Sequence, residues 1–511
     1  MNLARLRMVI SLLIFTLFLF LFCGPEKISA FLSSTLLPFQ VVPALIGILT
    51  HPEILFVAGF VFVMTVTLIF GRVYCSFLCP LGTLQDIFIA MSWKIGWRRK
   101  HAFQKSYHLL RNVLLGAVTV SALLGSMSLL NLLDPYSIAG RMVTQFVLPF
   151  FSGIYNGTVS VMNYFHVYLF SNDTAPLIFT VLLVNIAFFI LILILSFRYG
   201  RLYCNTLCPV GTLLGWISRV SLFTFAIEQT GCNACLKCAG VCKAGCIDAE
   251  KAVIDQSRCV GCFNCVSSCP QSVIRYRPFV RKKEGEPWSP ARRGVMIGSL
   301  AVAGYALSLY HSGIRNLLRT AHASAAPPVT PPGSVSLEHF TQSCSACHLC
   351  VSACPTKVLV PSLLEYGIGG LLQPKMNYPD SFCEYECNVC GRVCPTGAIL
   401  PLSVEDKKMT QIGKVDLLKD KCVVYINHQN CGACVEVCPT KTITFINKQN
   451  VLYPVVDNRF CVGCGACSKA CPTDPKSIVV HPHSVHGKAV KSLADGIPVR
   501  QKKAVPEEFP F

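Results

Sequence analysis

The sequence predicts a multi-domain membrane protein: an α-helical transmembrane bundle, of four helices plus a fifth, that carries two cysteine-rich α+β domains. Three observations support this fold class. Only 14% of the 511 residues are charged and 52% are hydrophobic, whereas a soluble domain carries about 25% charged residues. Thirty cysteines recur at short regular spacings, although disulfide scaffolds of this density are normally short secreted chains. A motif beside the apolar segments occurs twice. This composition excludes an ordinary soluble enzyme.

Five apolar segments are long enough, or nearly so, to cross about 30 Å of hydrocarbon: residues 8–22, 54–70, 113–130, 177–197 and 295–310. The net charge of +19 gathers in two basic clusters beside these segments, as in cytoplasmic loops, so the charge indicates topology and not nucleic-acid binding. We expect an inner-membrane protein with its amino terminus in the cytoplasm. The first segment follows Arg5 and Arg7 and could instead be a cleaved signal peptide.

The repeated motif occupies residues 71–84 and 200–213, with ten of fourteen positions identical. Each copy follows an apolar segment and contains Cys-x3-Cys-Pro. If helical, this spacing places both thiols on one face. Buried structural cysteine is the simpler interpretation. A shared redox or metal site is favoured, because the motif is duplicated where the membrane region meets the cysteine-rich cytoplasmic region. Arg72 and Arg201 could supply the positive field that reactive thiols need. The candidate redox relay is Cys75, Cys79, Cys204 and Cys208.

Two copies of Cys-x2-Cys-x2-Cys-x3-Cys follow, the spacing of bacterial ferredoxins. Three cysteines of each copy bind one [4Fe–4S] cluster, and the fourth crosses to the neighbouring cluster. By this rule Cys269 completes the first cluster and Cys242 the second. Lys243 replaces the usual proline, and the additional Cys246 leaves the fourth ligand of that copy open. The predicted ligands are Cys232, Cys235, Cys238, Cys242, Cys259, Cys262, Cys265 and Cys269.

A distal region repeats this theme four times, with two regular and two irregular motifs, which suffices for four more [4Fe–4S] clusters and six in all. Structural zinc is the alternative, but zinc sites rarely have three or four closely spaced cysteines of which the last is followed by proline. Cys344 to His348 also matches the signature of covalent haem c, although these cysteines open a complete ferredoxin motif. The predicted ligands are Cys344, Cys347, Cys350, Cys354, Cys383, Cys387, Cys390, Cys394, Cys422, Cys431, Cys434, Cys438, Cys461, Cys464, Cys467 and Cys471.

These features divide the chain into a membrane domain (1–222), a cytoplasmic two-cluster domain (223–280), a linker with the fifth apolar segment (281–333), a four-cluster domain (334–490) and a tail (491–511). Arg292 and Arg293 precede the fifth segment in the order typical of a twin-arginine export signal, unless they merely flank a membrane helix. We therefore expect the four-cluster domain to be periplasmic. The histidines at 481, 483 and 486 are expected in a solvated tail.

Residues 1–276 resemble NapH, a ferredoxin-type quinol dehydrogenase component, through the four spans, the two Cys-x3-Cys-Pro loops and the two-cluster domain. NosR and the CcoG/YccM proteins are similar. Asp134, Pro135, Ser137 and Arg141 resemble a recurrent loop of that group. Residues 291–486 resemble NapG and MauM, which are exported four-cluster ferredoxins, so the chain resembles a NapH–NapG fusion. The resemblance implies that distal clusters are ligated across motifs, the first with the fourth and the second with the third.

The resemblance also implies electron transfer from membrane quinol, through the clusters, to an extracytoplasmic reductase or cytochrome. From the residues alone, the chain is a membrane-anchored relay with six [4Fe–4S] clusters, and a seventh could lie at the Cys-x3-Cys-Pro loops. No nucleotide-binding glycine motif and no nucleophile–base set of a hydrolase or transferase is visible. The alternative is an assembly, maturation or regulatory redox factor that reduces a metal or cysteine centre of a partner enzyme.

Overall fold

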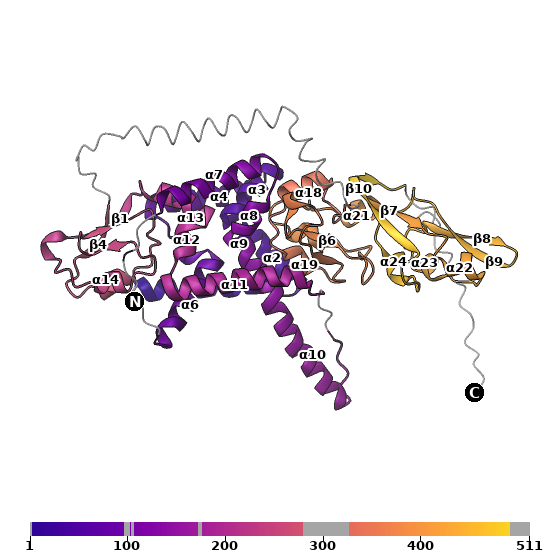
Figure 1. Cartoon of the computed structure of the whole chain (residues 1–511), viewed down its shortest axis with the longest axis horizontal. Helices are drawn as coiled ribbons and strands as arrows, with labels where there is room; N and C mark the ends of the chain where they lie inside the picture. Colours follow the sequence, from indigo (N-terminus) through magenta and orange to yellow (C-terminus); the bar gives the residue numbers. More distant parts are fainter. Residues whose placement is uncertain (1–2, 97–102, 104–106, 172–175, 279–326, 491–511) are drawn as a thin grey trace.

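The computed structural model describes residues 3–96, 103, 107–171, 176–278 and 327–490. A helical bundle (residues 3–218) lies in the middle of an elongated molecule (Figure 1). A proximal segment (residues 223–278) lies at one end of the bundle, and a distal segment (residues 327–490) lies at the other. The predicted fifth apolar segment, the arginine pair before it and the tail at 491–511 lie outside the described residues.

The bundle contains long apolar helices and short helices that carry the cysteine loops. A 3₁₀ turn at Leu37–Phe39 and a π-helical turn at Val143–Val147 connect helices of the bundle. The α-helices are α1 (Leu3–Cys23), α2 (Glu26–Leu36), α3 (Val41–Thr50), α4 (Ile54–Phe70), α5 (Tyr74–Phe77), α6 (Pro80–Lys94), α7 (His108–Leu123), α8 (Ser128–Leu133), α9 (Pro135–Met142), α10 (Leu148–Tyr164), α11 (Phe179–Tyr199), α12 (Leu202–Thr206) and α13 (Pro209–Ser218).

Among the described residues, α1 and α11 are each long and apolar enough to cross a membrane. Helices α2 and α3 form a pair bent by 95°, which would count as a third, broken span; the sequence analysis expected no span there. Helices α4 and α7 are apolar but shorter, with 17 and 16 residues. The predicted span at 113–130 ends early, because Gly125 takes a φ of +82° and the chain turns into α8.

Two α-helices, α9 and α10, follow α8. Asp134 caps α9, since its Oδ2 accepts hydrogen bonds from the backbone N and Oγ of Ser137 (2.9 and 2.6 Å), and Pro135 occupies the first helical position, where no donor is lost. Every residue of α9 is buried. Helix α10, by contrast, projects away from the bundle (Figure 1).

The proximal segment is a small α+β unit. Strand β1 (Phe223–Ile227) pairs antiparallel with β4 (Ile274–Pro278), and β2 (Ile247–Asp248) pairs with β3 (Val253–Ile254). The short helices α14 (Lys237–Gly240) and α15 (Asn264–Ser268) each begin inside a cysteine motif. The aromatic rings of Phe225, Phe263 and Tyr276 contact one another with centroid distances of 4.7–5.6 Å. This compact unit joins the two cysteine motifs.

The distal segment is a longer chain of similar units. Its helices are α18 (Leu337–Ser343), α19 (Leu349–Ala353), α20 (Val389–Val393), α21 (Val404–Met409), α22 (Val423–Asn427), α23 (Ala433–Glu436) and α24 (Ala466–Ala470). Its two-stranded sheets pair β5 (Leu359–Pro361) with β6 (Pro374–Met376), β7 (Thr410–Leu417) with β10 (Ile478–Lys488), and β8 (Ile443–Lys448) with β9 (Val451–Val456). The histidines at 481, 483 and 486 therefore lie in a strand, and the predicted solvated tail is wrong for them.

The distal segment is attached to its end of the bundle by contacts from several helices. The Oγ1 of Thr50, at the end of α3, donates to the backbone oxygen of Thr396 (2.6 Å). The Nδ2 of Asn131 in α8 donates to the backbone oxygen of Leu371 (3.1 Å). Glu26 of α2 forms an ion pair with Arg392 of α20. These contacts fix which cysteine motif faces the bundle.

Candidate functional site

The structure groups the predicted ligands into seven sets of four cysteines, which we number from the proximal to the distal end. Sites 1 and 2 lie in the proximal segment, site 3 lies in the bundle, and sites 4 to 7 lie in the distal segment. Two cavities mark the proximal sites. Site 1 consists of Cys232, Cys235, Cys238 and Cys269, and site 2 consists of Cys242, Cys259, Cys262 and Cys265. The structure thus shows the predicted crossing of Cys242 and Cys269.

Cys246 lines the same cavity as site 2 and is 2% exposed. Its sulfur lies 3.5 Å from the sulfur of Cys242. The hydrogen bond from Cys246 lowers the pKa of Cys242 to about 7, in spite of burial. A thiolate is the form of cysteine that binds metal. The arrangement therefore favours Cys242 as the fourth ligand and Cys246 as a donor to it.

The distal cysteines also form four groups, but the predicted pairing of motifs is wrong. The neighbours of each cysteine show that the first motif exchanges its fourth cysteine with the second motif, and the third exchanges with the fourth. Site 4 is Cys344, Cys347, Cys350 and Cys394, and site 5 is Cys354, Cys383, Cys387 and Cys390. Site 6 is Cys438, Cys461, Cys464 and Cys467, and site 7 is Cys422, Cys431, Cys434 and Cys471.

The exchange follows from local packing. Helix α19, inside the first distal motif, packs against α20 of the second, and α23 packs against α24. Each of these helices ends one or two residues before the cysteine that crosses. Motifs that are neighbours in sequence therefore pair as in a two-cluster ferredoxin.

The regular motifs share one backbone feature. The residue after the second cysteine adopts a left-handed conformation in each of them, at Leu236 (φ +60°), Phe263 (+60°), His348 (+64°) and Gly465 (+80°). This conformation is uncommon for residues other than glycine, and here it reverses the chain so that three sulfurs face one point. The corresponding residues of the irregular motifs, Asn388 and Gly432, have φ values of −128° and −111°.

His348 does not have the surroundings expected of a haem ligand. It is 1% exposed, and its Nε2 donates to the backbone oxygen of Leu372 (2.7 Å). Burial lowers its pKa to about 3, so the ring is neutral. Because Cys344 and Cys347 belong to site 4, the geometry favours the ferredoxin motif over haem c.

Site 3 brings together the two Cys-x3-Cys-Pro loops. All four sulfurs belong to residues that are 3–4% exposed, and each of the six pairs is close enough to interact electrostatically. The two thiols of each pair do not share one helix, so the condition for placing them on one helical face is not met. Cys75 lies in α5, whereas Cys79 caps α6; likewise Cys204 lies in α12 and Cys208 caps α13. The prolines at the first positions of α6 and α13 force the break between the two helices.

Each repeat supplies an arginine to the other repeat. Arg72 Nη2 donates to the backbone oxygen of Cys204 (3.0 Å) and lies 3.8 Å from the sulfur of Cys75. Arg201 Nη1 donates to the backbone oxygen of Cys75 (2.6 Å). Both side chains are at most 1% exposed. The thiols therefore sit in a buried, positively charged environment.

Asp86 and Gln85, which were not predicted as site residues, complete these surroundings. Asp86 is paired with Arg7, Arg201 and Lys243 at 2.8, 2.8 and 3.0 Å. Gln85 Oε1 accepts from the sulfur of Cys204 (3.1 Å), and its Nε2 has no partner in the described part of the chain. A lone aspartate in an apolar helix was the only signal available for Asp86.

Site 3 is attached to site 2 by hydrogen bonds to the backbone between its ligands. Ser76 Oγ donates to the carbonyl of Val260 (2.6 Å), and Asn205 Nδ2 donates to that of Ala244 (2.9 Å). Arg201 N donates to the carbonyl of Lys243 (2.8 Å). Val260 and Ala244 line the site 2 cavity. Lys243, in place of the usual proline, thus ties the proximal segment to the bundle through Asp86.

Among the described residues, no group of three or more His, Cys, Asp or Glu side chains is placed to hold a single metal ion. Cluster ligands need not converge on one ion, since each thiolate binds a separate iron at a corner of the cubane.

Residues 51–98 and 181–227 match a family described as a 4Fe-4S binding domain, and residues 255–358 and 421–474 each match a 4Fe-4S dicluster domain family. The first two segments contain the loops of site 3. No solved structure matches the chain.

Three relatives illustrate what the chain is similar to. The methylamine utilization ferredoxin-type protein MauM of Paracoccus denitrificans is 30% identical over 175 residues, 33% of this chain and 74% of MauM. The ferredoxin-type protein NapG of Escherichia coli is 30% identical over 198 residues, 37% of this chain and 81% of NapG. NapF of the same organism is 28% identical over 152 residues, 29% of this chain and 83% of NapF. The chain therefore belongs to the MauM/NapG family of ferredoxin-type iron–sulfur electron-transfer proteins.

Proposed function

We propose that this protein passes electrons from the quinol pool of the inner membrane, through [4Fe–4S] clusters, to an extracytoplasmic reductase or cytochrome. The observation that carries the proposal is the placement of site 3. Its four buried thiols lie inside the bundle that contains both long apolar helices, and the proximal and distal segments, which hold sites 2 and 4, lie at opposite ends of that bundle. A redox centre there is within reach of a lipid-soluble donor.

Twenty-four cysteines are assigned to six clusters at sites 1, 2 and 4 to 7, and the cysteines of site 3 are assigned to a seventh. The surroundings of site 3 fit an anionic group. Arg72 has no carboxylate partner in the described part of the chain, and its Nε is without a hydrogen bond. A cluster with four thiolate ligands would offset this buried charge. The family matched by both loops is described as 4Fe-4S binding, which supports the assignment.

We place the proximal segment in the cytoplasm and the distal segment in the periplasm. Support comes from the basic cluster around residues 94–111, which is expected on the cytoplasmic side, and from the separation of the two segments along the bundle. Reporter fusions after Tyr276 and after Pro332 should report the cytoplasm and the exterior respectively. A cytoplasmic signal from both, or an exterior signal from both, would contradict this topology. Changing Arg292 and Arg293 to Lys should leave the distal segment inside.

Quinol-driven reduction of the purified protein tests the proposed function. A synthetic quinol should reduce the ferredoxin clusters, as seen in their spectra, and replacing all four site 3 cysteines by Ser should abolish this reduction. Seven clusters predict about 28 iron atoms per chain, and the variant should hold about 24, at four per cubane. Cys23→Ser is the matched control, because Cys23 is exposed in α1 and belongs to no site. Full quinol-driven reduction in the fourfold variant would leave site 3 merely structural.

A further inference from the structure

The seven sites follow one another without a gap. Sites 1 and 2 exchange a cysteine, as do sites 4 and 5 and sites 6 and 7. Sites 5 and 6 are joined by the backbone hydrogen bond from Cys383 N to Cys464 O (2.8 Å). Sites 2 and 3 are joined through Ser76 and Asn205. The remaining junction, between sites 3 and 4, decides whether the two ends are connected.

Helix α9 makes that junction. Arg141 Nη1 donates to the backbone oxygen of Ala346 (3.2 Å), next to Cys347. A Cβ on Gly140 would lie 2.5 Å from the backbone oxygen of Cys347, so only glycine allows this approach. From the other side, Tyr203 of the second repeat donates through its hydroxyl to the backbone oxygen of Leu133 (2.8 Å), two residues before α9.

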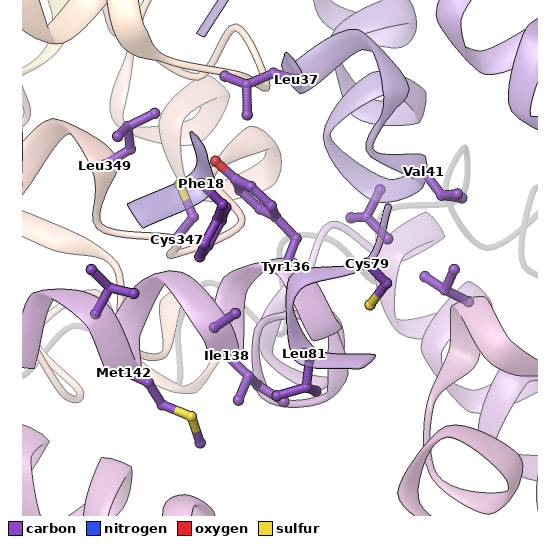
Figure 2. Close-up of a cluster of buried hydrophobic side chains, with 14 of the residues drawn as sticks. Phe18, Leu37, Val41, Cys79, Leu81, Tyr136, Ile138, Met142, Cys347 and Leu349 are labelled. Atoms are coloured by element: carbon purple, nitrogen blue, oxygen red, sulfur yellow. The ribbon is translucent and has the colours of Figure 1, made fainter. Parts of the chain in front are cut away.

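Tyr136 occupies the space between the two sites. Figure 2 shows its ring between Cys347 of site 4 and Cys79 of site 3. The ring is 1% exposed and packs edge-on against Phe18, with centroids 5.8 Å apart. Its hydroxyl interacts electrostatically with Cys347, Cys394 and Tyr74, and Tyr74 in turn interacts with Cys75 and Cys79.

The hydroxyl of Tyr136 has no hydrogen-bond partner in the described part of the chain. A buried tyrosine normally finds such a partner, so hydrogen bonding does not explain a tyrosine here. What the position does provide is an aromatic ring between two predicted redox centres.

We infer that sites 1 to 7 form one continuous electron path through the bundle, with Tyr136 as the positioning residue that couples sites 3 and 4. Electrons could then come from a soluble one-electron reductant at site 1 as well as from quinol, and they would leave to an acceptor at site 7. The inference rests on the proposed function in one respect, that site 3 binds a cluster. The cysteines of the seven sites would hold the clusters, which would relay one electron at a time from donor to acceptor with no bond formed or broken. Tyr136 is neither oxidised nor reduced.

Site 1 is suited to the donor end of this path. Cys235 is exposed, and Cys232 and Cys269 are partly exposed, whereas Cys242, Cys262 and Cys265 of site 2 are buried. At the other end, Cys431 and Cys434 of site 7 are partly exposed. Solvent thus reaches cysteines at both ends of the series, and it also reaches Cys383, Cys387 and Cys390 of site 5, which are partly exposed.

Sealed membrane vesicles that expose the proximal segment, with quinone extracted, test the inference. Dithionite, which does not cross the membrane, is added outside, and electron paramagnetic resonance follows the clusters of sites 4 to 7. We expect these clusters to be reduced in the full chain and in Cys23→Ser. Reduction should be lost in the Cys79→Ser, Cys208→Ser double variant and slowed in Tyr136→Leu. Tyr136→Phe, which keeps the ring, should match the unmodified chain.

Dithionite added after detergent lysis reports whether each variant retains its distal clusters. Absence of distal reduction in the full chain, or equal rates in Tyr136→Leu and Tyr136→Phe with clusters retained, would overturn the inference. If external dithionite does not reduce the distal clusters but quinol still reduces the protein, the proposed function stands. Reduction by external dithionite without any reduction by quinol would overturn the proposed function and support the path.

Discussion

Arg201 holds the backbone of Cys75 with a hydrogen bond of 2.6 Å, although the two residues belong to different copies of the repeat. Arg72 makes the reciprocal contact with Cys204. Neither copy can therefore form its own surroundings alone. The duplication of the Cys-x3-Cys-Pro motif is explained by the two copies building one site together.

The first prediction concerns Asp86, the carboxylate that neutralises this arrangement. Asp86→Asn removes the carboxylate that Arg7, Arg201 and Lys243 share in the described part of the chain, and these side chains are 0–9% exposed. Breaking a buried ion pair on one side costs about 3–5 kcal/mol. We expect a lower midpoint of thermal unfolding for the detergent-solubilised protein.

Asp457→Asn provides the control for Asp86. Asp457 forms an equally short ion pair with Arg459 (2.7 Å), but at the surface of the distal segment, where such pairs contribute little. The control should unfold as the unmodified chain does. Equal effects of the two substitutions would show that the buried network has no special importance.

The second prediction follows from the pairing of the distal motifs. Cys354→Ser should disturb site 5, because Cys354 lies beside Cys383, Cys387 and Cys390. Cys394→Ser should disturb site 4 in the same way. Spectra of the single variants should differ, and each should retain the signals of sites 6 and 7. Loss of a site 6 signal in Cys354→Ser would instead restore the pairing of the first motif with the fourth.

The proximal crossing was predictable and the distal one was not, for a physical reason. With two motifs, the crossing rule leaves one arrangement, so Cys242 and Cys269 could be assigned from spacing. With four motifs, the rule leaves several, and the choice depends on which helices pack together. The contact of α19 with α20 is not encoded in any spacing. The resemblance to other four-cluster proteins suggested a different choice, which was wrong.

The strand β10 was not predicted, because its apolar run is short and is followed by Pro482, which is uncommon inside strands. In the structure the proline coincides with a shift in register between β10 and β7, and pairing resumes at Gly487. Tyr136 and Asp86 could not have been assigned from sequence. Their roles depend on residues far away in the chain, such as Cys347 for Tyr136 and Lys243 for Asp86.

The third prediction separates Cys242 from Cys246. Cys242→Ser should lose the site 2 cluster, whereas Cys246→Ala should keep it, since Cys246 serves as a donor to the Cys242 sulfur. Hydrogen bonds to cluster sulfurs stabilise the reduced state and raise the reduction potential. A hydrogen bond of about 1 kcal/mol corresponds to about 40 mV for one electron, so the potential should fall by about that amount. Loss of the cluster in Cys246→Ala, with retention in Cys242→Ser, would reverse the two roles.

The last prediction concerns pH and His486 in β10. Its Nε2 lies 2.8 Å from Thr330 Oγ1. Burial, with a contribution from His483, lowers the pKa of His486 to about 4, against about 6.5 in an unfolded chain. The unfolded state therefore binds a proton that the folded state does not, and the stability of the distal segment should fall as pH drops from about 6.5 to about 4.

His486→Asn, which cannot titrate, should flatten the pH dependence of hydrogen exchange in β10 over this range. Above pH 7 the two proteins should show the same dependence, because His486 is neutral in both states there. An unchanged slope below pH 6.5 in the variant would show that another group controls the acid stability of this strand.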